Sequence, residues 1–372
     1  MLLSRRTLRA QKPSSPSRLS IRRSRQPRRG VIVVSDASNM RLPEGVDGPL
    51  ILVGQARSGS TLLTRLLAET HHFCLVNDAY ILQAMDDRGG GNVAAPGQIS
   101  DIWTYAHEIL AARSTADGVA TVNRSVFLDA EQLAALRRET AGVATAAANG
   151  ATTVAAVFAA AAAKSGAAIW GWNSPQDYLH VERLQTLYPR ARFVFLIRDP
   201  FAVLSSYKSL PAYWGVERNR YHPLIQSLVW RNVVREYARL ADRMPDRVSL
   251  VRYEDLIARP ERVWQTLSRL TGPFPTPPSA AALGRNGSGD ARQARPALTR
   301  AETWLCARIT QAGRRRWGYG DPPAPISGLG VASLLAATLR SGRYYLRRAT
   351  QSPAVRTQLG RYARHLVGVR SR

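Results

Sequence analysis

The chain has 372 residues and a formal net charge of +26, and 45% of its residues are apolar. This composition is typical of a soluble globular protein with one large domain. The two cysteines, Cys74 and Cys306, exclude a disulfide framework, and the six histidines show no spacing typical of metal ligands.

The positive charge is concentrated at the two ends of the chain. Residues 1–30 hold ten Arg or Lys and no acid, and residues 340–372 hold nine Arg and no acid, so these tails carry 19 of the 26 excess charges. We expect a disordered basic arm and lead-in over 1–47 and a basic helical extension over 323–372. Such tails contact anionic lipid, nucleic acid or an acidic partner, or stay solvated, and nucleic acid is disfavoured because interleaved aromatic residues are missing.

The ends of the chain also bear on localisation. No apolar run near Met1 could serve as a secretory leader, so we expect a cytoplasmic protein. The apolar run Ile326–Leu339 is about fourteen residues, shorter than the ~20 that a membrane span needs. It is either an interfacial helix at the inner face of the membrane or a last helix packed on the core. Lys occurs only at positions 12, 164 and 208, which indicates a GC-rich bacterial genome.

The first predicted core strand, Pro49–Val53, runs into a turn of small and hydroxyl residues, and a helix is predicted over Ser60–Glu69. A turn of this kind leaves backbone N–H groups at a helix start that bind phosphate or sulfate oxygens. The Lys of a Mg-ATP loop, G-x-x-x-x-G-K-[ST], is missing. We therefore predict an anion-binding turn that differs from an ATP loop and consists of Arg57, Ser58, Gly59, Ser60 and Thr61.

The middle of the chain begins with a glycine-rich loop over 86–100. Residues 101–165 are helical and Ala-rich in our prediction, and form either an insertion that shapes an acceptor site or a purely structural helical pair. A strand over Ala168–Trp172 follows, then Asn173-Ser174-Pro175 and a helix over Asp177–Leu187.

A second strand-to-helix turn follows the apolar strand Ala191–Ile197. It reads Arg198-Asp199-Pro200, with a helix from about Phe201 that carries Ser206, and it places Arg198 where open α/β sheets bind ligands. Further elements are predicted as a helix over 222–244, a strand over Asp246–Arg252 and a helix over Pro260–Leu270. This alternation predicts a three-layer α/β fold, with a central parallel sheet and helices on both faces.

Four segments in this order resemble the PAPS-dependent sulfotransferases of bacterial type, where PAPS is 3'-phosphoadenosine 5'-phosphosulfate. They are the turn around Arg57, the Arg198 turn with Ser206 eight residues later, Arg252-Tyr253-Glu254-Asp255-Leu256, and Gly318-Tyr319-Gly320. The resemblance covers roughly residues 48–320 and implies a P-loop-like sulfotransferase domain over 48–322.

The resemblance implies roles for these segments. The first turn would grip the 5'-phosphosulfate of PAPS, Arg198 and Ser206 would bind its 3'-phosphate, and Tyr253 is a further candidate for cosubstrate binding. No metal is implied. The acceptor would be a hydroxyl, less favourably an amine, of a carbohydrate, lipid or small molecule. Its pocket would come from residues 80–165 and 210–225, where the resemblance is thinnest.

The catalytic candidates are Arg57, Asp78, His72 and Asn173. Family members with a carboxylate base have a Glu about twenty residues after the loop Arg, and Asp78 stands there; alternatively Asp78 caps a helix beginning near Ala79. His72 is the second candidate base. Asn173 replaces a Lys that assists sulfuryl transfer in the family, so that charge is missing or is supplied elsewhere.

The sequence also allows two other functions. One is a phosphotransferase that uses the same anion-binding turn, and the other is a non-catalytic nucleotide-binding protein, which Asn173 favours. A Gly/Arg loop over 284–300 also carries Arg285, Arg292 and Arg295, which either contact the cosubstrate or the acceptor or face water.

Overall fold

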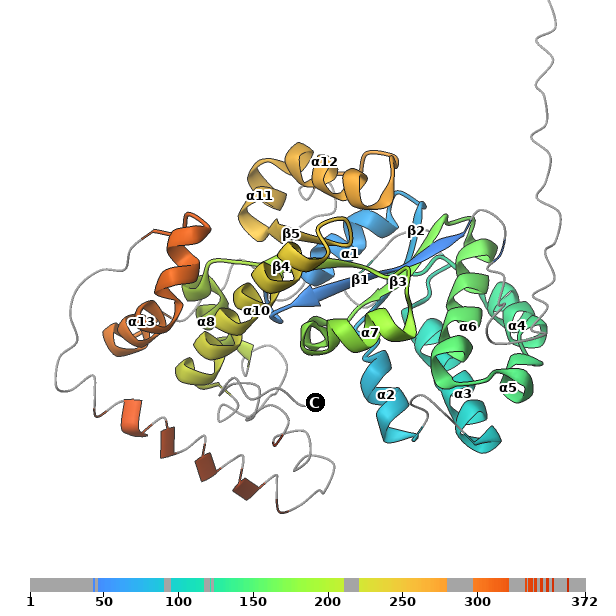
Figure 1. Cartoon of the computed structure of the whole chain (residues 1–372), viewed down its shortest axis with the longest axis horizontal. Helices are drawn as coiled ribbons and strands as arrows, with labels where there is room; N and C mark the ends of the chain where they lie inside the picture. The colour runs from blue at the N-terminus through green and yellow to red at the C-terminus, as the bar shows by residue number, and fades with distance from the viewer. Residues whose placement is uncertain are drawn as a thin grey trace, which may run out of the picture. The chain divides into compact units, whose positions relative to one another are not determined.

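Five parallel strands form the central sheet of the part of the chain that the structure describes (Figure 1). The computed structural model describes residues 43, 46–89, 95–116, 121, 124–210, 221–279 and 297–320, with scattered positions between 332 and 360. The strand order is β2-β3-β1-β4-β5. The strands are β1 (Asp47–Gly54), β2 (Phe73–Asn77), β3 (Ile169–Asn173), β4 (Arg192–Ile197) and β5 (Val248–Arg252).

Helices connect and flank the strands. They are α1 (Ser60–Ala68), α2 (Ile81–Asp87), α3 (Pro96–Arg113), α4 (Ala130–Glu139), α5 (Val143–Ala146), α6 (Gly150–Ser165), the 3₁₀ helix η2 (Pro175–His180), α7 (Val181–Leu187), α8 (Pro200–Lys208), α10 (Pro223–Arg243), α11 (Tyr253–Ala258), α12 (Pro260–Thr271) and α13 (Arg300–Arg316). Several begin where the sequence offers a capping residue. Asp199, for example, accepts a 2.8 Å hydrogen bond from the Ala202 N–H at the start of α8.

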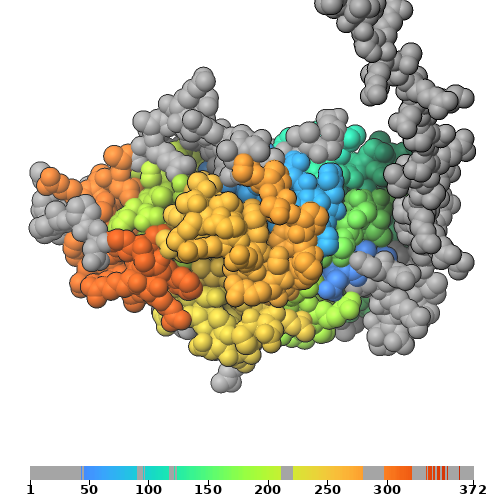
Figure 2. Space-filling model, turned by 90° about the horizontal axis from the view of Figure 1, so that it is seen from above, coloured from blue at the N-terminus to red at the C-terminus, as the bar shows by residue number. Residues whose placement is uncertain are grey.

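Alternate residues of each strand face two separate apolar layers. Leu50 and Leu52 of β1 pack with residues of α1 and α12, whereas Ile51 and Val53 pack with residues of α2, α3, α6, α7 and α10. Figure 2 shows the first of these faces, where the blue surface around α1 lies beside the orange surface of α12. Helices on both faces of a parallel sheet confirm the predicted three-layer α/β fold.

One strand differs from the sequence-based expectations. The strand β2 was not expected, because its apolar run is only Phe73–Val76, shorter than a typical buried strand. The Ala-rich helix α6, by contrast, lies in the region predicted to be helical; it is buried along most of its length and packs on the sheet. Alanine allows this helix to approach the strands closely while it keeps a high helix propensity. Whether this region also shapes an acceptor site stays a prediction.

Other expectations concern residues outside the described part of the chain. The arm 1–30, most of the extension 323–372, and the loop arginines Arg285, Arg292 and Arg295 fall there. None of the helices described has both the length and the apolar character required to cross a membrane.

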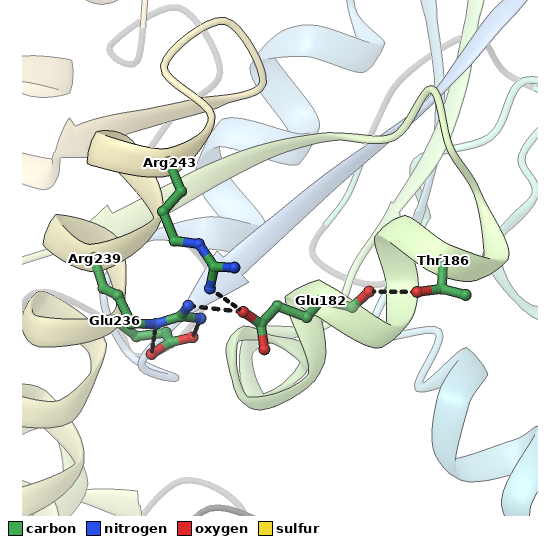
Figure 3. A network of polar contacts seen from close by, with 5 residues as sticks. All are labelled: Glu182, Thr186, Glu236, Arg239 and Arg243. Atoms are coloured by element: carbon green, nitrogen blue, oxygen red, sulfur yellow. Dashed lines mark hydrogen bonds and ion pairs between the residues drawn. The ribbon is translucent and has the colours of Figure 1, made fainter. Parts of the chain in front are cut away.

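A polar network joins α7 to α10 on the surface (Figure 3). Glu182 Oε1 accepts from Arg239 at 2.7 Å and from Arg243 at 2.6 Å, and Arg239 also pairs with Glu236. The hydrogen bonds from Arg239 are the main cause that lowers the pKa of Glu182 below its ordinary value of 4.5. Because Glu182 and Arg243 are exposed, water and salt screen the network and limit its contribution to stability.

We predict that Glu182→Gln lowers the free energy of unfolding by about 0.5 kcal/mol at neutral pH, because both arginines lose a charged partner. A lowered folded-state pKa contributes stability above the unfolded pKa, so the deficit should shrink as the pH falls below 4.5. Urea denaturation at pH 7 and pH 3 measures this, with exposed Glu108→Gln on α3 as the matched control. Equal stability of Glu182→Gln and the wild type at pH 7 would contradict the prediction.

Candidate functional site

The turn between β1 and α1 has a backbone conformation that few sequences allow. Arg57 has a φ of 74°, and Gly59, at the N-cap of α1, has a φ of 96°. A Cβ atom at position 59 would lie 2.4 Å from the Tyr253 ring, so only glycine fits between that ring and the turn. Positive φ at a non-glycine residue is uncommon and often marks a functional site.

Hydroxyl groups of the same turn are enclosed. Ser58 is fully buried and Ser60 nearly so, while Thr61 is half-buried. The Ser58 N–H donates to the Gln55 carbonyl at 3.2 Å, but its Oγ has no hydrogen-bond partner. A buried hydroxyl without a partner costs free energy, and an anionic ligand oxygen beside it would satisfy it. The first N–H groups of α1 likewise have no intrahelical acceptor.

The second turn, after β4, meets the first one directly. Arg57 Nε donates to Ser206 Oγ at 3.1 Å, and Arg198 Nη1 contacts the Arg57 carbonyl at 3.5 Å. The Arg198 guanidinium also lies over the Tyr253 ring, 4.2 Å from its centroid. The structure therefore brings together five predicted residues from three elements: Arg57, Gly59, Arg198, Ser206 and Tyr253.

Asp78 follows the carboxyl end of β2 with a φ of 48°. Burial raises the pKa of its carboxyl above the ordinary 3.8, and the positive charges of Arg113 and Arg57 offset part of that shift. The alternative role as a helix cap is wrong, because α2 begins at Ile81 and its N-cap residue is Tyr80, with no side-chain capping bond. Asp78 thus lies on the same edge of the sheet as the two turns, within the field of Arg57.

Asn173, at the carboxyl end of β3, is fully buried. Its Nδ2 donates to Asn77 Oδ1 at 2.6 Å, and Asn77 Nδ2 lies 3.4 Å from Asp78 Oδ2. Arg113 Nε donates to the Asn77 carbonyl at 2.8 Å. The Asn77 side chain therefore links the Asn173 amide to the Asp78 carboxyl.

His72 is not brought to this site. It precedes β2 and so lies at the amino edge of the parallel sheet, opposite the edge that carries Arg57 and Asp78. Its ring packs against Phe73 and Phe274, with centroids 5.1 and 6.2 Å away, and burial lowers its pKa. The suggestion that His72 serves as a base is thus wrong in this fold, because the strand β2 separates it from the turns that carry Arg57 and Arg198.

Several residues around the site carried no functional prediction. Arg113 lies in a helix without a recognisable motif, whereas Glu254 and Tyr319 belong to the two late motifs and received no role. Trp230 of α10 donates from Nε1 to the Arg198 carbonyl at 2.8 Å, a contact that helical periodicity alone cannot reveal. Within the described ranges, no group of three or more His, Cys, Asp or Glu side chains could hold a metal ion.

Comparison with solved structures finds similar chains of low sequence identity. Solved structures similar to this chain include the sulfotransferase STF9 from Mycobacterium avium, with a TM-score of 0.42 and 16% identity over 75% of this chain and 79% of that one. A sulfotransferase domain from the curacin biosynthetic pathway has a TM-score of 0.40 and 17% identity over 78% of this chain and 98% of its own. A sulfotransferase domain from the Synechococcus PCC 7002 olefin synthase has a TM-score of 0.39 and 18% identity over 79% and 96%.

A search among curated proteins gave no significant match. A family sequence model described as the sulfotransferase family, however, matches residues 49–273, from within β1 to just beyond α12. This match spans more than half of the chain and includes the Arg57 turn, Asp78, the Arg198 turn and Tyr253. The chain therefore belongs to the sulfotransferase family.

Proposed function

We propose that this protein is a sulfotransferase that moves a sulfuryl group from PAPS to a hydroxyl group of its acceptor. The observation that carries the proposal is the meeting of two anion-binding turns. Arg57 is bonded to Ser206 at 3.1 Å, and Arg198 reaches the Arg57 carbonyl at 3.5 Å. A ligand with negative charge at two positions suits such a pair of turns, because each turn supplies its own guanidinium.

The residues present fit this cosubstrate. The start of α1, Arg57 and the unpartnered Ser58 hydroxyl would hold the 5'-phosphosulfate. Arg198 and Ser206 would hold the 3'-phosphate, which is the group that distinguishes PAPS from ATP. Tyr253 supports the proposal because its ring contacts Arg198 and leaves room only for glycine at position 59.

The transfer forms a bond between the acceptor oxygen and sulfur and breaks the bond between sulfur and the phosphate oxygen, so that 3',5'-ADP leaves. The acceptor hydroxyl loses its proton, and we assign Asp78 as the group that accepts it. Its raised pKa supports this role, because a carboxylate with higher basicity is a stronger general base. Arg57 would stabilise charge that develops near the sulfuryl group.

The acceptor, the domain limits and the localisation are also proposals. We infer a catalytic domain over 48–322 and an acceptor hydroxyl on a carbohydrate, a lipid or a small molecule. The protein would act in the cytoplasm. Contact of the basic tails with the inner face of an anionic membrane stays a prediction, since the tails lie almost wholly outside the described residues.

Calorimetric titration with 3',5'-ADP and with ADP tests the cosubstrate. We expect clear preference for 3',5'-ADP, whereas preference for ADP would favour a phosphotransferase. Labelled PAPS incubated with a lysate of the producing cells would then identify the acceptor by its labelled product. Binding of PAPS without transfer to any acceptor would favour a non-catalytic nucleotide-binding protein.

We predict that Arg198→Ala weakens 3',5'-ADP binding by about 30-fold, the scale of losing one charged hydrogen bond of about 2 kcal/mol. Affinity for 5'-AMP, which lacks the 3'-phosphate, should change far less. Arg138→Ala, at an exposed position of α4, is the matched control. Unchanged affinity of Arg198→Ala for 3',5'-ADP would overturn the assignment of the 3'-phosphate contact.

We predict that Asp78→Asn lowers the rate of sulfuryl transfer by roughly 10²- to 10⁴-fold, the range for loss of a general base. Affinity for 3',5'-ADP should stay near that of the wild type, because the amide keeps the size of the carboxylate. Single-turnover transfer of labelled sulfuryl measures the rate, with exposed Asp101→Asn on α3 as the control. Full activity of Asp78→Asn would mean that another group accepts the proton.

The same assignment predicts a pH profile. Transfer requires the ionised form of Asp78, so kcat/KM should fall as the pH drops through its pKa. Because burial raises that pKa, the midpoint of the acid limb should lie above 3.8. The residual activity of Asp78→Asn should lack this limb, and a limb that persists in the variant would assign it to a different group.

A further inference from the structure

The Glu254 carboxylate, at the second residue of α11, joins two segments far apart in the sequence. Its Oε1 accepts from the Asp199 N–H at 2.8 Å, and its Oε2 accepts from the Tyr319 hydroxyl at 2.9 Å. Both oxygens are thus occupied, one by the turn after β4 and the other by the Gly-Tyr-Gly segment after α13. Hydrogen bonds to a carboxylate are stronger than those between neutral groups.

The Asp199 N–H and the Arg198 carbonyl belong to the same peptide unit, and both are held by side chains. Trp230 donates to the Arg198 carbonyl at 2.8 Å, while Glu254 accepts from the Asp199 N–H. The strand ends at Ile197 and the helix begins at Pro200, so this peptide lies between two regular elements. Its orientation is therefore fixed by α10 and α11 from outside the turn.

Tyr319 is itself held firmly. Its N–H donates to the Arg314 carbonyl at 2.9 Å, and Arg314 bonds to the Gly320 carbonyl. Its ring packs edge-on against Trp230 with centroids 6.1 Å apart, and the Arg252 guanidinium lies 4.6 Å from the ring centroid. Only 7% of Tyr319 is exposed.

Tyr319 links the two side chains that hold this peptide, Trp230 and Glu254. The tyrosine ring contacts Trp230, and the tyrosine hydroxyl bonds to Glu254. Gly313 of α13 also packs against Trp230, and a Cβ at position 313 would lie 2.6 Å from the indole ring. In Figure 2 the orange-red surface of α13 borders the gold surface of α11.

We propose that Glu254 and Tyr319 are positioning residues for Arg198, and that through it they set the affinity for the 3'-phosphate of the cosubstrate. The inference rests on the proposed function. Glu254 fixes the peptide that follows Arg198. Its neighbour Tyr253 packs its ring against the Arg198 guanidinium, with the ring centroid 4.2 Å away. The start of α11 thus controls both the backbone and the side chain of the residue that would meet the 3'-phosphate.

The test compares 3',5'-ADP with 5'-AMP in the full-length protein, since the two differ by the 3'-phosphate alone. The ratio of their Kd values, measured by calorimetry, is the readout. We expect the preference for 3',5'-ADP to fall about 3-fold in Tyr319→Phe and about 10-fold in Glu254→Gln, the scale of losing hydrogen bonds to a carboxylate. The affinity for 5'-AMP should stay close to that of the wild type.

Two matched controls are available. Tyr188→Phe removes a buried hydroxyl that has no hydrogen-bond partner, and Glu182→Gln removes a carboxylate bonded to two arginines between α7 and α10. Both should leave the ratio unchanged. Tyr319→Phe keeps the ring packed on Trp230, so it decides the question even where Glu254→Gln fails to fold.

The outcomes separate this inference from the function on which it rests. A ratio that stays at the wild-type value in Tyr319→Phe, or equal weakening of both nucleotides, would show a merely structural role and overturn the inference. If Arg198→Ala lowers the ratio in the same experiment, the proposed function stands without the inference. A wild-type protein that does not prefer 3',5'-ADP to 5'-AMP would overturn both.

Discussion

The close pairing of β1 with β4 at their carboxyl ends is the contact on which the site depends. Gly54 ends β1 and pairs with Leu196, and a Cβ at position 54 would lie 2.4 Å from the Leu196 carbonyl oxygen. Any larger residue would separate the strands where both turns begin. Because Arg57 follows Gly54 by three residues and Arg198 follows Leu196 by two, this pairing brings the two turns together, and Arg198 Nη1 reaches the Arg57 carbonyl at 3.5 Å. The two guanidinium groups also contact neutral groups, the Ser206 hydroxyl in the case of Arg57 and the Tyr253 ring in the case of Arg198.

Much of the fold could be predicted from the sequence, because its central strands are long apolar runs followed by turn residues. The runs ending at Val53 and Ile197 specify β1 and β4, and their turns carry the arginines. The contact between Arg57 and Ser206 could not be predicted, because it depends on strand order and register. The strand β2 escaped notice for a local reason: its apolar run, Phe73–Val76, is only four residues long.

The unpredicted part of the site consists of side chains that act on backbone groups of other elements. Trp230 and Glu254 bind one peptide unit after β4, and neither residue type nor spacing marks them for that task. Arg113 is the last residue of α3, a position where arginine is common and usually faces solvent. Here its side chain instead donates to the Asn77 carbonyl. Sequence patterns report which face of an element is apolar, whereas these bonds depend on how elements meet in three dimensions.

The neutral Asn173 bears on the electrostatics of Asp78. Asn173 bonds to Asn77, which lies directly before Asp78, so a lysine ammonium in its place would bring positive charge close to that carboxyl. Such a charge would favour the carboxylate and lower its pKa, opposing the effect of burial. With an amide at position 173, the opposing charges come from Arg57 and Arg113, and burial remains the larger effect. Under the proposed function, an amide at position 173 would give up a cation beside the transferring group and would preserve the basicity of Asp78, which is the property that a general base requires.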